Sequence, residues 1–345
     1  MKPKFVLSKS RVLEQYEKVK AVSDIVSYSS KTNPLVSGVL EERTDSMFSV
    51  HSVHELKNIE DKSRVIFLVQ GWGKEELKDL IFEGVRFFVV DNVQDLEILK
   101  SHLGRNFIPG ISVFLRLKLK EHTLKTEKYF VFGFGSDFIR SEILELKKLD
   151  CVDKVGIHFH RKTQNVSEWE LRREIEGSFD ESFLKELDYI VIGGGLPSAY
   201  ANTNVKIFNG IFEKIKNFRK WVNGFGVKVI IEPGRYIAAP AVKLVSHVKA
   251  IYDKNIVVDA SVYNTDMDAL IVPVKLLVEG EISREDGKSY VIKGITPCSM
   301  DLFRYRVYLK EEPSVGDEIV FLNAGAYNFA SDFCDLPRLE TEIVD

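Results

Sequence analysis

The sequence has few cysteines and no long apolar run. Cys151, Cys298 and Cys334 are widely spaced, show no metal-ligand pattern and leave an odd number, which favours free thiols in a reducing compartment. No apolar stretch approaches the length that crosses a bilayer, and the first residues lack the apolar region of a secretory signal. We therefore expect a cytoplasmic protein without a membrane segment.

The chain also lacks an excess of charge of either sign. It has 48 lysines and arginines against 51 aspartates and glutamates, a net charge of −3, and the basic residues are mixed with acidic ones. No nucleic-acid-binding surface is therefore expected. The 345 residues are enough for one large domain and a smaller one.

Short β-branched or aromatic runs alternate with longer amphipathic stretches from Asp24 to Tyr236, which is typical of repeated βα units. Eight runs predict strands at 24–30, 47–50, 65–70, 86–90, 111–117, 154–158, 189–192 and 227–232. Apolar residues three and four apart predict helices that include 73–83, 92–103, 136–149 and 206–223. Eight such units favour a (β/α)8 TIM barrel, with a doubly wound open sheet as the alternative.

After Pro240 the sequence becomes rich in β runs without long helical stretches, which predicts a small all-β sandwich or barrel domain. The expected strands are 242–251, 256–259, 270–279, 289–293, 304–309 and 317–322. Residues 4–8 are a further candidate strand for this domain. The predicted boundaries are 22–239 for the barrel, with 1–21 and 240–345 forming the β domain.

A lysine follows the first predicted strand. The stretch 24–30 leads directly into Lys31, and the Asn33-Pro34 pair prevents the strand from continuing. The active site of a (β/α)8 barrel is built at the C-terminal ends of its strands, where this lysine is expected. A desolvated amine there can be neutral and nucleophilic and can form a Schiff base with a carbonyl compound. A surface lysine with no such role is the alternative.

Three later strand ends carry other residues suited to chemistry. His158 and His160 share one face of the sixth strand; metal binding is not expected because no carboxylate or further histidine is suitably spaced, whereas a flat ring could stack on a cofactor. The glycines 193–195 form either a simple turn or a backbone approach to a phosphate. Glu232 and Arg235 bring an anion and a cation close together, suited to a ring nitrogen and a phosphate, unless they form a plain turn.

The complete set of motifs, in chain order, is Tyr28-Ser-Ser-Lys31-Thr-Asn33-Pro, His160, Gly193-Gly194-Gly195, Glu232-Pro-Gly-Arg235-Tyr, Cys298 and Gly325-Ala326-Tyr327. This set resembles the fold-type III pyridoxal-phosphate-dependent decarboxylases, the group of ornithine, diaminopimelate and arginine decarboxylases that is related to alanine racemase. The resemblance covers nearly the whole chain. Each motif alone is weakly specific, whereas the ordered set at matching strand ends is strongly specific.

The resemblance implies that pyridoxal 5'-phosphate is the cofactor and that Lys31 holds it through a Schiff base. His160 would stack on the pyridine ring, and Glu232 would pair with the ring nitrogen. A carboxylate there keeps this nitrogen protonated and favours decarboxylation, whereas alanine racemases have an arginine. The phosphate would be bound by Gly193, Gly194, Gly195, Thr163, Arg235 and Tyr327.

The resemblance also implies a homodimer with shared active sites, in which a cysteine of one subunit protonates Cα in the other. Cys298 is the candidate, although only two residues separate it from Asp301 where the family usually has three. A buried structural thiol is the alternative. Lys162 stands where the family has a glycine and Thr163 where it has a serine; this lysine either binds phosphate or points away.

The substrate is expected to carry a distal amine, because a buried ammonium group needs an anionic partner. Asp266 and Asp268, in a segment loosely similar to the carboxynorspermidine decarboxylases, and Asp301 are the candidate partners, with a structural role as the alternative for Asp301. We therefore predict decarboxylation of ornithine, lysine or a carboxylated polyamine. The alternatives are a diaminopimelate decarboxylase, an amino-acid racemase on the same fold, and an inactive regulatory homologue.

Overall fold

The computed structural model describes residues 2–68, 70–105, 108–119, 132–328 and 330–345. These residues form two compact units. The barrel unit comprises residues 16–197 and 206–234, and the β unit comprises 1–15, 198–205 and 235–345. The domain boundaries expected from the sequence stay a prediction.

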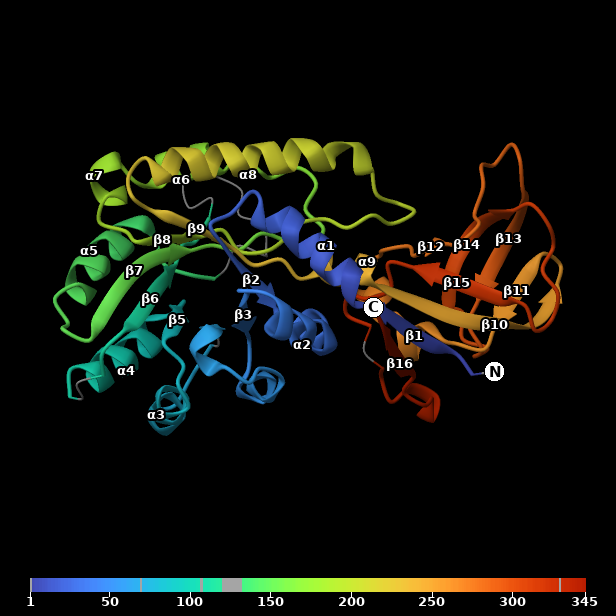
Figure 1. Cartoon of the computed structure of the whole chain (residues 1–345), viewed down its shortest axis with the longest axis horizontal. Coiled ribbons are helices and arrows are strands. Elements are labelled where there is room, and N and C mark those ends of the chain that lie inside the picture. The colour runs from blue at the N-terminus through green and yellow to red at the C-terminus, as the bar shows by residue number, and fades with distance from the viewer. Residues whose placement is uncertain (1, 69, 106–107, 120–131, 329) are drawn as a thin grey trace. The chain divides into compact units, whose positions relative to one another are not determined.

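Parallel strands close into a barrel in the barrel unit (Figure 1). They are β2 (Ile25–Ser29), β3 (Met47–Val50), β4 (Val65–Leu68), β5 (Phe87–Val90), β6 (Ile111–Arg116), β7 (Val152–His158), β8 (Tyr189–Val191) and β9 (Lys228–Ile231). Each strand pairs with the next, and β9 returns to β2 through the pairs Ile25–Ile230 and Val26–Ile231. The predicted (β/α)8 barrel is confirmed, and the open-sheet alternative is wrong.

The barrel strands are apolar on both faces because helices cover the outer face and side chains fill the interior. Ile66, Val89, Phe114, Val191 and Ile230, each from a different strand, form one fully buried cluster. This explains why the strands read as continuous hydrophobic runs in the sequence. Because the barrel interior is filled with apolar side chains, polar functional residues are expected at the C-terminal ends of the strands.

Helices lie outside the barrel strands (Figure 1). They are α1 (Lys9–Lys20), which begins in the β unit, α2 (Pro34–Arg43), α3 (Lys74–Phe82), α4 (Val93–Leu103), α5 (Ser136–Leu146), α6 (Leu171–Ser178), α7 (Glu181–Leu184) and α8 (Phe208–Asn223). Shorter 3-10 turns are η1 (Ser30–Thr32), η2 (Val53–Asn58), η3 (Lys62–Arg64) and η4 (Val205–Ile207). The four predicted helices are present with small shifts at their ends.

The β unit is built on a mixed sheet with the strand order β12-β15-β10-β11-β13-β14, and β1 pairs with both β10 and β16. Its strands are β1 (Lys4–Ser8), β10 (Val242–Tyr252), β11 (Asn255–Val258), β12 (Leu277–Val278), β13 (Lys288–Lys293), β14 (Leu302–Leu309), β15 (Glu318–Leu322) and β16 (Glu340–Val344). Short helices are α9 (Arg235–Ala241), α10 (Val262–Thr265), α11 (Asp268–Ile271) and the 3-10 turn η5 (Phe333–Asp335).

The expected strand 270–279 is wrong. Its first residues belong to α11, whose last turn is closed by a hydrogen bond from Val272 N to Asp268 O, and only Leu277–Val278 is paired as a strand. Pro273 lies in the middle of this apolar run and has no N–H to give to a sheet, so the run cannot form one continuous strand. In the part of the chain that is described, no helix is long and apolar enough to span a membrane.

Candidate active site

Lys31 stands two residues beyond the end of β2, in the turn η1. The turn is held on one side by Tyr28, whose hydroxyl donates to the Asn33 carbonyl at 3.1 Å. On the other side, the Asn33 side chain accepts from Leu35 N at 3.1 Å and caps α2, with Pro34 as the first helical residue. The Asn-Pro pair therefore ends the strand, as predicted, by starting a helix.

The amine of Lys31 has a pKa below that of an ordinary lysine. Loss of solvation is the main cause; the carboxylates of Glu55 and Glu232 oppose it, and the charge of Arg116 adds to it. The side chain is nevertheless exposed. The two facts agree because a lysine at the rim of a barrel can contact water while protein atoms replace much of the solvent around it. Lys31 is therefore accessible and more often neutral than a surface lysine.

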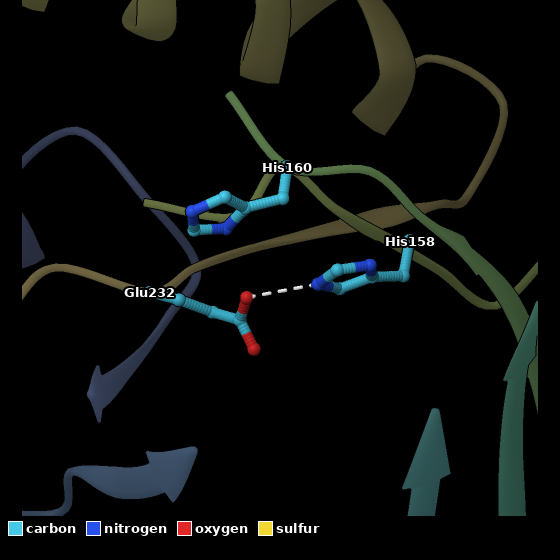
Figure 2. A group of neighbouring side chains, drawn as sticks. All are labelled: His158, His160 and Glu232. Carbon is cyan, nitrogen blue, oxygen red and sulfur yellow. Dashed lines mark hydrogen bonds and ion pairs between the residues drawn. The ribbon is translucent and has the colours of Figure 1, made fainter. Parts of the chain in front are cut away.

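Glu232 follows β9 and is almost completely buried. Both of its carboxylate oxygens have partners: Ser49 Oγ donates to Oε1 at 2.6 Å, and His158 Nε2 lies 3.0 Å from Oε2 (Figure 2). Burial alone would raise the pKa of Glu232, but His158 and the hydrogen bond from Ser49 outweigh it and lower the pKa to about 2. The carboxylate is therefore ionised throughout the physiological pH range.

His158 and His160 have nearly parallel rings, with centroids 6.5 Å apart and an angle of 13° between the planes. Figure 2 shows both rings beside the Glu232 carboxylate. Burial is the main cause that lowers the pKa of His160 to about 3, and Gly194 N donates to its Nδ1 at 3.3 Å. His160 is therefore a neutral flat ring.

The expectation that no carboxylate accompanies these two histidines is wrong. A carboxylate does accompany the pair, because β9 brings Glu232 to it, and ligand atoms of all three residues lie within 4.8 Å of one another. Sequence spacing could not show this, since Glu232 lies 72 or more residues further along the chain. The expectation that no metal binds here stays a prediction.

Gly193, Gly194 and Gly195 follow β8 and leave no room for side chains. A Cβ atom would lie 2.5 Å from the Phe159 carbonyl oxygen at the first glycine, 2.7 Å from the Glu232 carbonyl oxygen at the second, and 2.8 Å from a carbonyl oxygen at the third. The first and third glycines also have φ angles of 66° and 93°, which favour glycine. The close backbone approach is thus a requirement of the fold around the site.

The basic residues after His160 separate in the structure. Arg161 is buried, pairs with Glu174 at 3.1 Å and lies over the Trp169 ring, so it is a packing residue. Lys162 is exposed, and Thr163 is partly buried. The roles predicted for Lys162 and Thr163 stay predictions.

Several polar residues at the strand ends were not predicted. Arg116 ends β6 and pairs with Asp91 at 3.4 Å, and Gln70 Nε2 donates to the same carboxylate at 2.6 Å. Ser49, in β3, contacts Glu232, and His51 follows β3. Their position directly at the C-terminal ends of predicted strands is the signal that could have identified them.

In the β unit, Arg235 and Asp268 form a buried ion pair. Both guanidinium Nη atoms contact the carboxylate, the second one at 3.0 Å, and Arg235 also donates to the Tyr200 hydroxyl at 3.0 Å. The Tyr327 ring lies 5.2 Å from the guanidinium carbon. Burial would lower the pKa of Arg235, but the contact with Asp268 outweighs it and raises the pKa. Asp268 is therefore already engaged by a cation.

The other two predicted acids of the β unit differ from each other. Asp266 is buried, and burial followed by repulsion from Asp268 raises its pKa well above the usual range. Asp301 accepts hydrogen bonds from Ser261 Oγ, Val262 N, Thr296 N and Thr296 Oγ1, at distances from 2.7 to 3.0 Å. These contacts tie three chain segments together, which supports the structural alternative for Asp301.

Cys298 lies beside an aromatic pair. Its sulfur is 3.0 Å from the Tyr263 hydroxyl, and the Tyr263 ring stacks on Phe333 with centroids 3.9 Å apart. The hydrogen bond with Tyr263 is the main cause that lowers the pKa of the Cys298 thiol. The thiol is partly exposed and free, so it is not the buried structural thiol considered as the alternative.

Comparison with known proteins agrees with this arrangement. Residues 10–239 match the family model described as pyridoxal-dependent decarboxylase, pyridoxal binding domain. Diaminopimelate decarboxylase of Aquifex aeolicus is 26% identical over 318 residues, covering 82% of this chain and 70% of the relative. The structure of lysine/ornithine decarboxylase from Vibrio vulnificus complexed with cadaverine has a TM-score of 0.80 at 21% identity, covering 99% of this chain and 94% of that one. Diaminopimelate decarboxylase from Helicobacter pylori complexed with L-lysine has a TM-score of 0.79 at 20% identity, covering 100% and 92%.

The chain belongs to the family of pyridoxal-dependent decarboxylases. Pyridoxal phosphate is the cofactor of this family, and the residues of the barrel unit fit it. Glu232 offers an ionised, buried carboxylate, and Gly193–Gly195 let the backbone approach neighbouring segments so closely that a Cβ atom would clash. Lys31 supplies an accessible amine whose pKa is lowered. The resemblance inferred from the ordered motifs is confirmed.

Proposed function

We propose that this protein decarboxylates an amino acid that carries a distal amine, with pyridoxal phosphate held covalently by Lys31. The observation that supports it most is Glu232, an ionised carboxylate fixed by Ser49 and His158 at the strand end next to that of Lys31. A carboxylate held in this way is suited to keeping a facing ring nitrogen protonated. The arginine of alanine racemases is absent from this position, which disfavours racemization.

Each residue of the barrel unit has a distinct task in this proposal. When bound, the cofactor supplies a ring that accepts the electron pair released as the carboxylate leaves the substrate. Glu232 holds a proton at the ring nitrogen, and His160 stacks against the ring as a neutral group. Gly193–Gly195 and Thr163 direct polar groups at the phosphate.

In the β unit we propose that Arg235 and Tyr327 also bind the phosphate. The bidentate contact with Asp268 fixes the guanidinium plane and leaves fewer rotamers to be lost on binding. We therefore assign Asp268 to positioning Arg235 rather than to reading the substrate. Because its thiols are free, we propose a cytoplasmic location.

We propose Asp266 as the partner of the distal amine. It is buried, and an incoming ammonium group would favour its ionised form and bring the raised pKa down. The relatives named above act on diaminopimelate, lysine or ornithine, and diaminopimelate has a distal carboxylate that would need a cation. The charges of Lys275 and Arg235 also act on Asp266, so the proposal of a distal amine rests on this buried carboxylate and not on a lack of cations around it. A carboxylate partner favours a diamino acid or a carboxylated polyamine over diaminopimelate.

The experiment is a screen for carbon dioxide release from both enantiomers of ornithine and lysine, from diaminopimelate and from carboxylated polyamines. We expect release from a substrate with a distal amine, and Asp266→Asn should then raise KM for that substrate about a hundredfold, because an unpaired buried ammonium costs a few kcal/mol. The exposed Asp253→Asn serves as control. Loss of optical rotation without carbon dioxide would show a racemase instead, and an unchanged KM in Asp266→Asn would place the amine elsewhere.

We also propose a homodimer in which Cys298 acts on the cofactor of the other subunit. Mixing inactive Lys31→Ala and Cys298→Ala proteins, with subunit exchange shown by mass spectrometry, should restore up to about a quarter of the activity per site, because only one of the two sites in a heterodimer is intact. As a control, Lys31→Ala is mixed with Cys151→Ala, which changes a thiol outside the proposed site. This mixture shows the activity that is expected when the cysteine variant is not impaired. Proven exchange without recovery from the first mixture would contradict a shared site.

A further inference from the structure

His51 is a titratable residue at the same end of the barrel as Lys31. It directly follows β3, and β2 and β3 pair in parallel with Ser29 opposite Ser49. Lys31 and His51 therefore each stand two residues beyond the same paired position, on neighbouring strands. The turn η1 packs against both β3 and η2, so the two residues belong to one cluster of packed segments.

The charged groups around His51 are those of Lys31 on η1, Glu55 on η2 and Glu232 after β9. The His51 backbone N–H donates to Glu55 Oε2 at 3.2 Å, and its Nδ1 lies 3.7 Å from the same oxygen. Within the described residues this buried Nδ1 has no hydrogen-bond partner. A buried ring nitrogen without a partner costs free energy, so its retention beside a carboxylate points to a use.

The ring of His51 is unprotonated at neutral pH. Burial is the main cause that lowers its pKa, the neighbouring Glu55 carboxylate opposes this, and the charge of Lys31 lowers the pKa further. The imidazole is therefore neutral near pH 7 and has one nitrogen with a free lone pair. Glu55 is placed to stabilise the imidazolium ion that forms when a proton arrives.

We propose that His51 is the base that takes a proton from the Lys31 ammonium group and so prepares the amine to attack a carbonyl compound, an inference that rests on the proposed function. One N–H bond of the ammonium group breaks, and its electron pair stays on Nζ. The proton forms a bond with the ring nitrogen of His51 that carries no hydrogen. The resulting imidazolium ion, stabilised by Glu55, then releases the proton to water.

The test measures cofactor attachment to the protein without bound cofactor, and so does not depend on turnover. At saturating pyridoxal phosphate and pH 7, the first-order rate of covalent attachment is followed by visible absorbance and by borohydride trapping on the Lys31 peptide. We expect His51→Ala to slow attachment about a hundredfold, the lower part of the range for acid–base groups. Added imidazole should restore most of the rate, because the free base can occupy the vacated space.

Two further variants separate proton transfer from a structural effect. His51→Gln keeps a polar side chain but cannot take the proton, and should be as slow as His51→Ala. His54→Ala, an exposed histidine on the same turn η2, should attach the cofactor at the wild-type rate with or without imidazole. Thermal unfolding followed by circular dichroism checks that the variants are as stable as the wild-type protein.

If the wild-type protein attaches the cofactor and His51→Ala attaches it at the same rate, the inference about His51 is wrong and the proposed function still stands. A slow His51→Ala protein that imidazole does not restore also overturns it, since the histidine would then act by packing. If the wild-type protein does not attach the cofactor at Lys31 at all, the proposed function fails as well. The two failures are therefore distinguishable.

Discussion

Replacing Lys31 with alanine is expected to remove covalent cofactor attachment and to reduce decarboxylation by about 10⁴-fold, the upper part of the range for a positioned acid–base group. The reason is the combination of position and electrostatics: the amine stands at the C-terminal end of β2, is accessible, and has a lowered pKa. Absorbance of the bound cofactor and borohydride trapping followed by peptide mass spectrometry measure the attachment.

Lys57→Ala is a suitable control for this variant. Lys57 is an exposed lysine on η2, close in sequence to the same end of the barrel, and its loss should leave both attachment and turnover unchanged. If Lys31→Ala still carries a borohydride-reducible cofactor, another lysine holds it and the assignment of Lys31 is wrong. Thermal unfolding should be little altered, because the Lys31 side chain is solvent-accessible.

The barrel could be predicted because its strands are buried on both faces and stand out as short apolar runs. The end of the first strand differs slightly from the prediction of 24–30, because β2 ends at Ser29. Lys31 lies beyond it in a turn, and Asn33 and Pro34 start a helix immediately afterwards. The strand expected at 270–279 failed because an apolar run alone does not reveal that Pro273 interrupts the hydrogen bonds of a sheet. Local composition thus predicts which segments are buried better than it predicts how they pair.

Residue partners across the barrel could not be predicted. The sequence singled out His160 and Glu232, but the hydrogen bonds of Glu232 to Ser49 and His158 join strands that are far apart in the chain. Asp268 was expected to face the substrate, whereas a bidentate contact with Arg235 occupies it. Only the folded structure shows which of several plausible partners a charged group takes.

Replacing Glu232 with glutamine should reduce decarboxylation by about 10²- to 10³-fold, the cost of removing one well-placed electrostatic group. Glutamine keeps the size of the side chain and can still contact Ser49 and His158, but a neutral amide cannot hold a proton at a facing ring nitrogen. Cofactor attachment at Lys31 should therefore persist. The exposed Glu75→Gln is the matched control and should leave turnover unchanged. Near-normal turnover in Glu232→Gln would contradict the role of this carboxylate.

The pH dependence of stability gives a second measurement on the same variant. The folded-state pKa of Glu232 is lowered to about 2, below the ordinary value of 4.5. A carboxylate with a lowered pKa stabilises the fold above its unfolded pKa, and this contribution is lost as the pH falls through the folded pKa. The free energy of unfolding of the wild-type protein should therefore fall between pH 4.5 and 2, and that of Glu232→Gln should fall less over the same interval. Denaturant titrations at these pH values measure the difference, and equal slopes would show that Glu232 is not held ionised by Ser49 and His158.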